Sequence, residues 1–311
     1  MKILFYTDPH NCDTPPRMRK ASYTEDILDK QEQLIPIAQS CDLVICGGDI
    51  FHQKKAGRVS YQLTRKLMDI YSEFGHMYII PGNHDFELNI DEVFSKSPIM
   101  MFEQLSNVEI LHQKTLEWDE TIICGFGGGD YYDARTLLRV TEKCKEYYGA
   151  KKKGKIGVFH SSVTHEQQPY DIIPADRFLD TFDALCLGHI HDVQRVDHSI
   201  IAPGALSRGV LRLDASMERE VGCAVFEVGV NGITSFEFIK LDYKIPQDAF
   251  YLERKLSEKE IENASAKLIE FVDSMDVPKA LTEDDLIEYI EDMDGLDSTV
   301  KQQALRLLRS M

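Results

Sequence analysis

The chain has 311 residues, 43% of them hydrophobic, and a formal net charge of −17 at pH 7. This length permits one large α/β domain, or one domain with an appendage. No apolar run approaches the ~20 residues of a membrane-spanning helix, and Met1 leads directly into a strand-like run, so we expect neither a membrane span nor a signal peptide. The 7 cysteines never occur as Cys-x-x-Cys, which predicts free thiols in a reducing compartment. The negative charge argues against a polyanionic partner without excluding one, because a site for divalent cations also needs carboxylates.

The first predicted strand, residues 2–7, ends in Asp8-Pro9-His10. Side chains on a strand alternate between its faces with period two, so Asp8 and His10 fall on the same side. A carboxylate and an imidazole placed in this way can bind one cation. A helix is predicted over residues 24–39, where apolar residues recur at helical spacing.

The second predicted strand, residues 42–46, runs into Gly47-Gly48-Asp49-Ile50-Phe51-His52. The glycines allow a tight turn that can bring Asp49 under the end of another strand. A helix over residues 61–74 and a strand over 77–80 follow, and the strand leads into Gly82-Asn83-His84-Asp85. Asn83 offers a carbonyl oxygen, position 84 carries histidine, the side-chain type that changes charge near neutral pH, and Asp85 can orient the His84 imidazole. Alternating strands and helices predict parallel strands, whose carboxyl ends share one edge of a sheet.

Further polar residues follow later strands. A helix is expected over residues 91–113, and the glycines of 124–129 indicate a tight turn, because the Lys-Ser/Thr of a phosphate-binding loop is missing. A strand over 155–159 delivers His160, and one over 182–187 ends in Gly188-His189-Ile190-His191. The combined nitrogen and oxygen ligands, without cysteine, predict two divalent ions of the manganese, iron or zinc kind that share Asp49.

These motifs resemble the signature of the calcineurin-like metallophosphoesterases over roughly residues 1–210. The motifs are Asp8-Pro9-His10, Gly48-Asp49, Gly82-Asn83-His84-Asp85, His160 and Gly188-His189-Ile190-His191. Within that superfamily, Gly48-Asp49-Ile50-Phe51-His52 and Pro203-Gly204-Ala205-Leu206-Ser207-Arg208 are similar to the SbcD-type branch of DNA-repair nucleases from bacteria and phages. The resemblance implies a mixed α/β fold, a four-layer α-β-β-α sandwich. It also implies a protein of the cytoplasm, either of a bacterium or of a phage-infected host.

The resemblance also implies the roles of the site residues. One ion would bind Asp8, His10, Asp49 and His191, and the other Asp49, Asn83, His160 and His189. A hydroxide bridging two Mn²⁺, or Fe²⁺ or Zn²⁺, would attack the phosphorus of a DNA phosphodiester. His84, held by Asp85, would protonate the leaving oxygen, and His52 would contact phosphate.

The substrate remains open at this point. Cations in the loops after the first two motifs are candidates for phosphate contacts: Arg17, Arg19, Lys20, Lys54, Lys55 and Arg58. We interpret the basic run 151–155 as a solvated loop at the opposite end of its strand. The alternatives to a DNA phosphodiesterase are a phosphoesterase for small nucleotides or phosphoproteins, and a metal-less interaction scaffold.

The C-terminal side predicts a short appendage. Residues 222–241 can form a hairpin that turns at Asn231-Gly232. We place the nuclease domain at 1–245 and expect three short amphipathic helices over 246–311, either a reduced cap or a partner-binding tail. The resemblance suggests an SMC-like coiled-coil ATPase of the SbcC type as that partner. The apolar run Ile99-Met100-Met101-Phe102 suggests a homodimer, with full burial as the alternative.

Overall fold

The structure is a computed structural model that describes residues 1–53, 58–85, 97–112, 114–128, 134–149, 151–164, 172–210 and 219–253. The chain divides into two compact units, residues 1–250 and 251–311. The helices expected over 246–311 lie outside the described residues beyond residue 253. The predicted boundary at 245 therefore stays a prediction.

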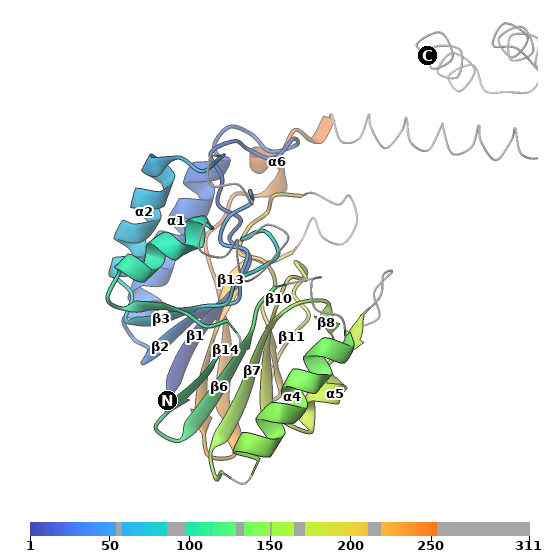
Figure 1. The fold of residues 1–311 in the computed structure, drawn as a ribbon. Coiled ribbons are helices and arrows are strands. Elements are labelled where there is room, and N and C mark those ends of the chain that lie inside the picture. The colour runs from blue at the N-terminus through green and yellow to red at the C-terminus, as the bar shows by residue number, and fades with distance from the viewer. Residues whose placement is uncertain are drawn as a thin grey trace, which may run out of the picture. The chain divides into compact units, whose positions relative to one another are not determined.

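The first unit contains two six-stranded sheets (Figure 1). In the first sheet the strand order is β14-β13-β1-β2-β3-β4, and in the second it is β11-β12-β10-β7-β6-β5. The first sheet consists of β1 (Lys2–Tyr6), β2 (Leu43–Cys46), β3 (His76–Ile79), β4 (Val108–Ile110), β13 (Gly222–Gly229) and β14 (Gly232–Lys240). The second consists of β5 (Thr115–Trp118), β6 (Thr121–Phe126), β7 (Gly154–His160), β10 (Ala184–Gly188), β11 (Arg195–Val196) and β12 (Ile200–Ala202).

Helices cover the outer face of each sheet, while two very short strands pair with each other outside the sheets. The remaining elements are α1 (Tyr23–Ala38), α2 (Tyr61–Ser72), η3 (Pro98–Gln104), α4 (Ala134–Tyr148), β8 (Val163–Thr164), β9 (Ile173–Pro174), α5 (Asp176–Leu179) and α6 (Pro246–Ala249). The result is the predicted four-layer α-β-β-α sandwich.

The sequence of β1 explains the layering, because all of its apolar side chains are buried on alternating faces. Ile3 and Phe5 lie in the core between the two sheets, and Leu4 and Tyr6 lie in the core under α1 and α2. A third core joins the second sheet to α4 and α5. Parallel strands buried on both faces read as continuous apolar runs, which is the pattern of β1 and β2.

Two local predictions can be compared directly with the structure. The hairpin is confirmed, since β13 pairs with β14 and Gly232 adopts φ 93° at the turn. The helix expected over 91–113 is wrong at its C-terminal end, because Val108–Ile110 forms strand β4 beside β3. The pairing buries Val108 and Ile110, and this tertiary contact overrides the local helical pattern.

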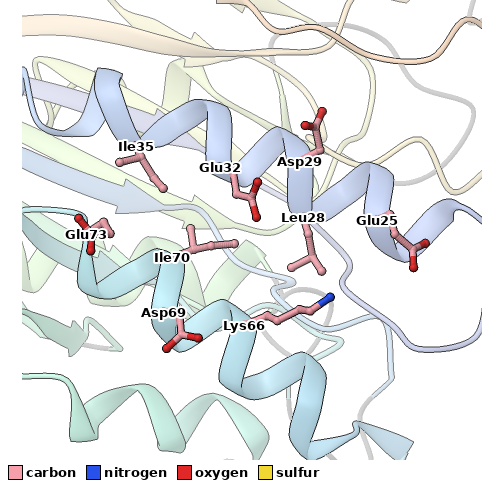
Figure 2. A pocket seen from close by; sticks show the side chains of 9 residues that line it. All are labelled: Glu25, Leu28, Asp29, Glu32, Ile35, Lys66, Asp69, Ile70 and Glu73. Atoms are coloured by element: carbon pink, nitrogen blue, oxygen red, sulfur yellow. The ribbon is translucent and has the colours of Figure 1, made fainter.

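A groove of about 610 Å³ lies between α1 and α2 (Figure 2). Its floor is apolar, with Leu28, Ile35 and Ile70, and Lys66 is the one basic residue among the described residues that line it. The rim is acidic and consists of Glu25, Asp29, Glu32, Asp69 and Glu73. This surface is unfavourable for a polyanion. Within the described part of the chain, no helix combines the length and the apolar character needed to cross a membrane.

Candidate metal centre

The predicted ligands come together where strands of both sheets end. The loops after β1 and β2 are joined by backbone hydrogen bonds, since Asp8 N donates to Gly48 O (3.0 Å) and His10 N to Asp49 O (2.9 Å). The strands β7 and β10 are parallel neighbours, and their register sets Gly188 opposite His160. Loops that are distant in sequence therefore share one edge, as the parallel topology predicts.

The first group of ligand atoms surrounds His10 and His191. Their Nε2 atoms lie 3.0 Å apart. Asp8 Oδ1 lies 3.7 Å from each of these nitrogens, and Asp49 Oδ2 lies 3.5 Å from His10 Nε2. The four residues are the ligands assigned to one ion from sequence.

The second group contains Asn83, His160 and His189. Asn83 Oδ1 lies 3.2 Å from His160 Nε2 and 3.0 Å from His189 Nδ1. Asp49 Oδ2 is 3.4 Å from His160 Nε2. The same carboxylate oxygen thus faces both groups, which is the geometry that a shared ligand requires.

Buried polar atoms show that these residues fit divalent cations. Asp8 Oδ1 is buried and has no hydrogen-bond partner among the described residues, although the other oxygen of Asp8 accepts bonds from Thr7 Oγ1 (2.6 Å) and His189 N (3.0 Å). An unpaired buried carboxylate oxygen is costly unless a cation neutralises it. The Nδ1 atom of His160 lies 2.6 Å from Gly47 O. A proton on Nδ1 leaves Nε2 as a ligand, as in most histidine metal sites.

Charge in the pocket also favours cations. Burial opposes ionisation of Asp49, but the positive charges of His160 and His10 hold its pKa well below its usual range. Burial and the nearby His10 lower the pKa of His191 to about 4. At neutral pH Asp49 is therefore ionised and His191 neutral, the protonation states in which these groups bind metal. Although burial opposes it, the charge of Asp49 raises the pKa of His160 to about 10, so a cation that binds His160 must displace a proton.

The backbone is strained at several of the predicted ligands. Among the described residues, positive φ outside glycine occurs at Asp8 (53°), His10 (47°), Asp49 (50°), Asp119 (49°) and His189 (80°). Four of these five are predicted ligands, and such strain concentrates at functional sites. Sequence patterns carry no signal for it.

Glycines make room for the close approach of the loops. A Cβ atom on Gly82 would overlap the side chain and the amide nitrogen of Asp49, and one on Gly48 would overlap the His160 ring. Gly48 also has φ 108°. The glycines flanking the predicted ligands are thus required by packing as well as by the turn.

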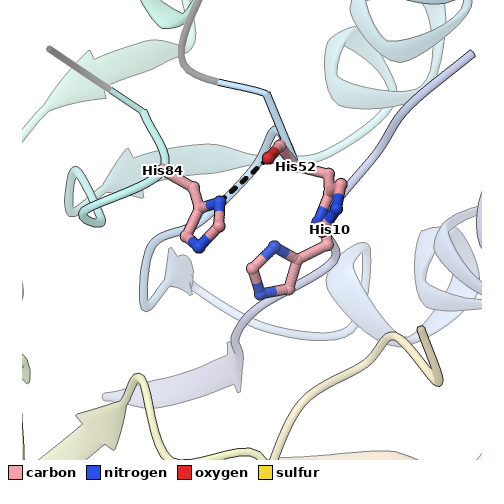
Figure 3. Close-up of side chains that lie close together, drawn as sticks. All are labelled: His10, His52 and His84. Carbon is pink, nitrogen blue, oxygen red and sulfur yellow. Dashed lines mark hydrogen bonds between the residues drawn. The ribbon is translucent and has the colours of Figure 1, made fainter. Parts of the chain in front are cut away.

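A second histidine pair lies beside the first ligand group (Figure 3). The rings of His52 and His84 stack with centroids 5.5 Å apart, and His84 lies 5.0 Å from His10. His84 Nδ1 is 2.9 Å from the carbonyl oxygen of His52. Burial and the charges of His10 and His84 lower the pKa of His52 to about 4. Because its Nδ1 atom is engaged by this carbonyl oxygen, His84 has its Nε2 atom left for another contact.

The predicted contact between Asp85 and the His84 ring is wrong. Asp85 is fully buried and accepts hydrogen bonds from Phe51 N (3.1 Å) and Gly82 N (2.8 Å). Its carboxylate ties the loop after β2 to the loop after β3, while the His52 carbonyl orients the His84 ring. Two amide donors within the loops satisfy the carboxylate better than one imidazole outside them.

The predicted phosphate-binding cations differ in burial and in their partners. Arg19 is buried, binds Asp26 Oδ2 at 2.6 Å and packs on Tyr23 and Phe250, so we withdraw it as a substrate contact. Lys20 Nζ donates to Gln247 O (2.8 Å). Arg17 and Arg58 are exposed. Lys54 and Lys55 lie outside the described residues.

A comparison with protein families identifies the chain. The model of the calcineurin-like phosphoesterases matches residues 1–193, well over half of the chain. Within the described residues, groups of histidine and aspartate that could hold a metal ion lie at one edge of the two-sheet fold, and the family match implies a metal-dependent phosphoester hydrolase. The chain belongs to the calcineurin-like phosphoesterase family.

Individual relatives are distant. The chain is 24% identical over 261 residues to the double-strand break repair protein mre-11 of Caenorhabditis elegans, an alignment that covers 67% of this chain but 35% of that protein. It is 21% identical over 218 residues to protein 244L of Invertebrate iridescent virus 6, whose name assigns it to the phosphoesterases, with 66% of this chain and 70% of that protein covered. The crystal structure of TT1561 from Thermus thermophilus gives a TM-score of 0.48 at 16% identity and covers 77% of this chain and 98% of that one.

Proposed function

We propose that this chain hydrolyses phosphodiester bonds in DNA with two divalent ions, preferably Mn²⁺. The observation that carries the proposal is the His52–His84 pair beside the ligand cluster. An alkoxide leaving group, such as a deoxyribose oxygen, needs a proton donor, and a positioned histidine supplies one. The similarity to mre-11, a double-strand break repair protein, supports DNA as the source of that ester.

In this proposal seven residues bind the ions, and His84 transfers a proton. Asp8, His10, Asp49 and His191 would hold one ion, and the same Asp49 with Asn83, His160 and His189 the other. When bound, such ions activate water and neutralise charge on the phosphate oxygens. His84 Nε2 would protonate the departing oxygen, because its Nδ1 is already engaged by the His52 carbonyl. His52 would contact the phosphate.

Manganese is proposed from the chemistry of the donor atoms. The set contains carboxylate, amide and imidazole groups and no thiolate. Carboxylate and amide oxygens suit Mn²⁺, imidazoles suit Fe²⁺ and Zn²⁺, and the predicted ligands include none of the thiolates that most favour zinc. Titration of the metal-free protein with each ion, followed by activity measurements, distinguishes them.

A direct assay tests the substrate. Purified chain with Mn²⁺ should cleave single- or double-stranded DNA and bis(p-nitrophenyl) phosphate, and should act poorly on p-nitrophenyl phosphate. Preference for the monoester, or for free nucleotides over DNA, would favour the small-substrate alternative. If the purified protein binds no Mn²⁺ at millimolar concentrations of the ion, the scaffold alternative is favoured.

Phosphate contacts outside the metal centre can be tested through salt. Binding of DNA should weaken steeply with salt, and Arg17→Gln with Arg58→Gln should reduce the slope of log K against log salt by about 1 for each lost phosphate contact. The matched control neutralises Arg135 and Arg139, exposed on α4. Equal effects of both pairs would show that Arg17 and Arg58 only contribute to net charge.

Two partner interactions remain proposals. An SMC-like coiled-coil ATPase would dock on the helices predicted within 246–311. Because Phe250 is buried and packs on Arg19, a truncation should follow Glu253. That protein should keep its metal and its hydrolysis of DNA and lose co-purification with the ATPase. Aggregation would instead favour a reduced cap that belongs to the core.

The 99–102 run exposes less apolar surface for a dimer contact than its sequence predicts. Ile99 and Phe102 are fully buried, and Met101 is 42% exposed. Met101→Glu should prevent a dimer if this surface mediates one. Sedimentation equilibrium of wild-type protein and variant measures this, and a monomeric wild-type protein well above micromolar concentration would rule the dimer out.

A further inference from the structure

Basic side chains cap three consecutive carbonyl groups close to the metal centre. Arg219 donates from Nη1 to Ala205 O (2.7 Å) and from Nη2 to Ser207 O (2.6 Å). Lys30 Nζ donates to Leu206 O (3.1 Å). We call Ala205-Leu206-Ser207 the bridging segment.

The amides of the bridging segment are bonded to the loops that carry two predicted ligands. Ala205 N donates to His191 O (2.9 Å), and Ser207 N donates to Asp8 O (3.1 Å). Leu206 N donates to Thr7 O (2.8 Å), the residue directly before Asp8. The bridging segment therefore joins the loop after β1 to the loop after β10, from the first sheet to the second. Asp8 and His191 belong to the same ligand group, so their separation depends on this connection.

The placement of Lys30 is unfavourable for stability. It lies on α1 with 4% of its surface exposed, and its surroundings include Arg19, Arg208 and Arg219, while Asp26 supplies the opposing charge. Burial of an ammonium group among like charges costs free energy that an apolar side chain would avoid. Groups held at such a cost are frequently functional, and among the described residues the hydrogen bond of this ammonium group goes to a carbonyl oxygen of the bridging segment.

We propose that Lys30 and Arg219 are positioning residues of the metal centre. By capping its carbonyl groups they fix the bridging segment, and the segment holds Asp8 and His191 at the separation that one ion requires. In this role neither residue would contact the substrate or the ion. The inference rests on the proposed metal-dependent hydrolysis, but it does not require that the substrate be DNA.

The test separates metal binding from folding. Lys30→Met keeps the length of the side chain and removes the charge and the donor. The metal-free variant should have a melting temperature equal to or above that of the wild-type protein. Calorimetric titration with Mn²⁺ should show one of the two binding events weakened about 10-fold to 100-fold, the usual effect of groups that orient ligands. With bis(p-nitrophenyl) phosphate, kcat should fall while KM changes little.

Arg219→Lys provides an independent variant, because a lysine keeps the charge but cannot bond both carbonyl groups in the same geometry. It should weaken the same Mn²⁺ binding event, and Arg219→Met should weaken it further. The matched control is Asn107→Ala, which removes bonds from Nδ2 to the carbonyl groups of Tyr71 (2.9 Å) and Phe74 (2.9 Å) at the opposite end of the first sheet. This control should lower the melting temperature and leave the Mn²⁺ affinity of the folded protein unchanged.

Two results would overturn the inference. One is wild-type Mn²⁺ affinity and kcat in both Lys30→Met and Arg219→Lys. The other is a loss of affinity that follows the melting temperature in the variants and in Asn107→Ala alike. A wild-type chain that binds Mn²⁺ and cleaves the model diester but not DNA refutes the proposed substrate and leaves this test valid.

Discussion

The Nε2 atoms of His10 and His191 lie 3.0 Å apart, although 181 positions separate the two residues in the chain. The nearest carboxylate oxygens lie at 3.5 to 3.7 Å from these nitrogens. Two imidazole nitrogens face one another here, beside two carboxylates. A cation between them would interact favourably with both the nitrogen lone pairs and the negative carboxylates. The relationship joins the loops after β1 and β10, which no local pattern connects.

Metal stoichiometry should therefore respond differently to two substitutions. His191→Ala removes a ligand from one group and should lower the Mn²⁺ content by about one ion per chain, from the two expected of a two-metal site. Asp49→Ala should abolish both sites, because Asp49 Oδ2 faces His10 at 3.5 Å and His160 at 3.4 Å. Elemental analysis after dialysis measures both. Equal loss in the two variants would argue against a shared ligand.

His84→Ala should keep the metal content and lose hydrolysis of substrates with poor leaving groups. The expected loss in kcat is about 10²–10⁴-fold, the usual contribution of a general acid. An aryl phosphodiester, which leaves without a proton, should be affected much less. The control is His198→Ala, because His198 Nδ1 also lies 3.0 Å from a carbonyl oxygen, that of Ile233, but far along the sheet from the ligands. Loss of metal from His84→Ala would reassign it as a ligand.

Gly82→Ala should disable the site although alanine carries no new chemistry. The added Cβ would overlap the Asp49 carboxylate and amide, so the shared ligand must move. We expect a Mn²⁺ affinity reduced at least about 10-fold, as for other disturbances of ligand orientation. Gly75→Ala is the matched control, since its nearest neighbour, Cys41 O, lies 4.0 Å from the added atom. Calorimetric titration of both variants checks the prediction, which fails if they bind Mn²⁺ equally well.

Lys30 should make stability rise with pH. Burial and the charges of Arg19 and Arg219, with Asp26 opposing and Arg208 adding, lower the pKa of Lys30 from 10.5 to about 7. Between these values the unfolded chain binds more protons than the folded one, so the free energy of unfolding increases with pH across that window. Below pH 7 both states are protonated and the buried charge carries its full cost.

Lys30→Met should remove this contribution to the slope and stabilise the protein most at and below pH 7, where the buried charge carries its full cost. One pKa unit corresponds to about 1.4 kcal/mol, and the lost hydrogen bond offsets about 1–3 kcal/mol of the gain. Urea unfolding of the metal-free proteins at several values from pH 6.5 to 9.5 measures the difference. Parallel curves for wild-type protein and variant would show that the pKa of Lys30 is not depressed.

The positions of the predicted ligands can be derived from sequence because each depends on a local signal and one general rule. A buried strand followed by a polar residue predicts where Asp8, Asn83 and His160 lie along the chain, and parallel topology brings the strand ends together. The α1 helix and the β13–β14 hairpin likewise follow from local periodicity and turn residues.

The partners of individual side chains were not accessible in the same way. Asp85 was expected on the His84 ring, yet it bonds the amides of Phe51 and Gly82, since a buried carboxylate is satisfied by whichever donors the folded loops supply. Arg19 was expected on the substrate and instead forms a buried pair with Asp26. The partner that each of these side chains takes depends on tertiary packing, which leaves no periodic pattern in the sequence.

The left-handed backbone at Asp8, His10, Asp49 and His189 sets stability against metal binding when these positions mutate. Each such conformation costs about 1–3 kcal/mol outside glycine, so glycine at any of these positions relaxes the backbone while it removes a ligand. A descendant released from the need for metal would therefore be drawn towards glycine or asparagine at these sites by stability alone. All four positions carry aspartate or histidine, so at each of them this chain keeps a side chain that can bind metal at a cost in backbone strain.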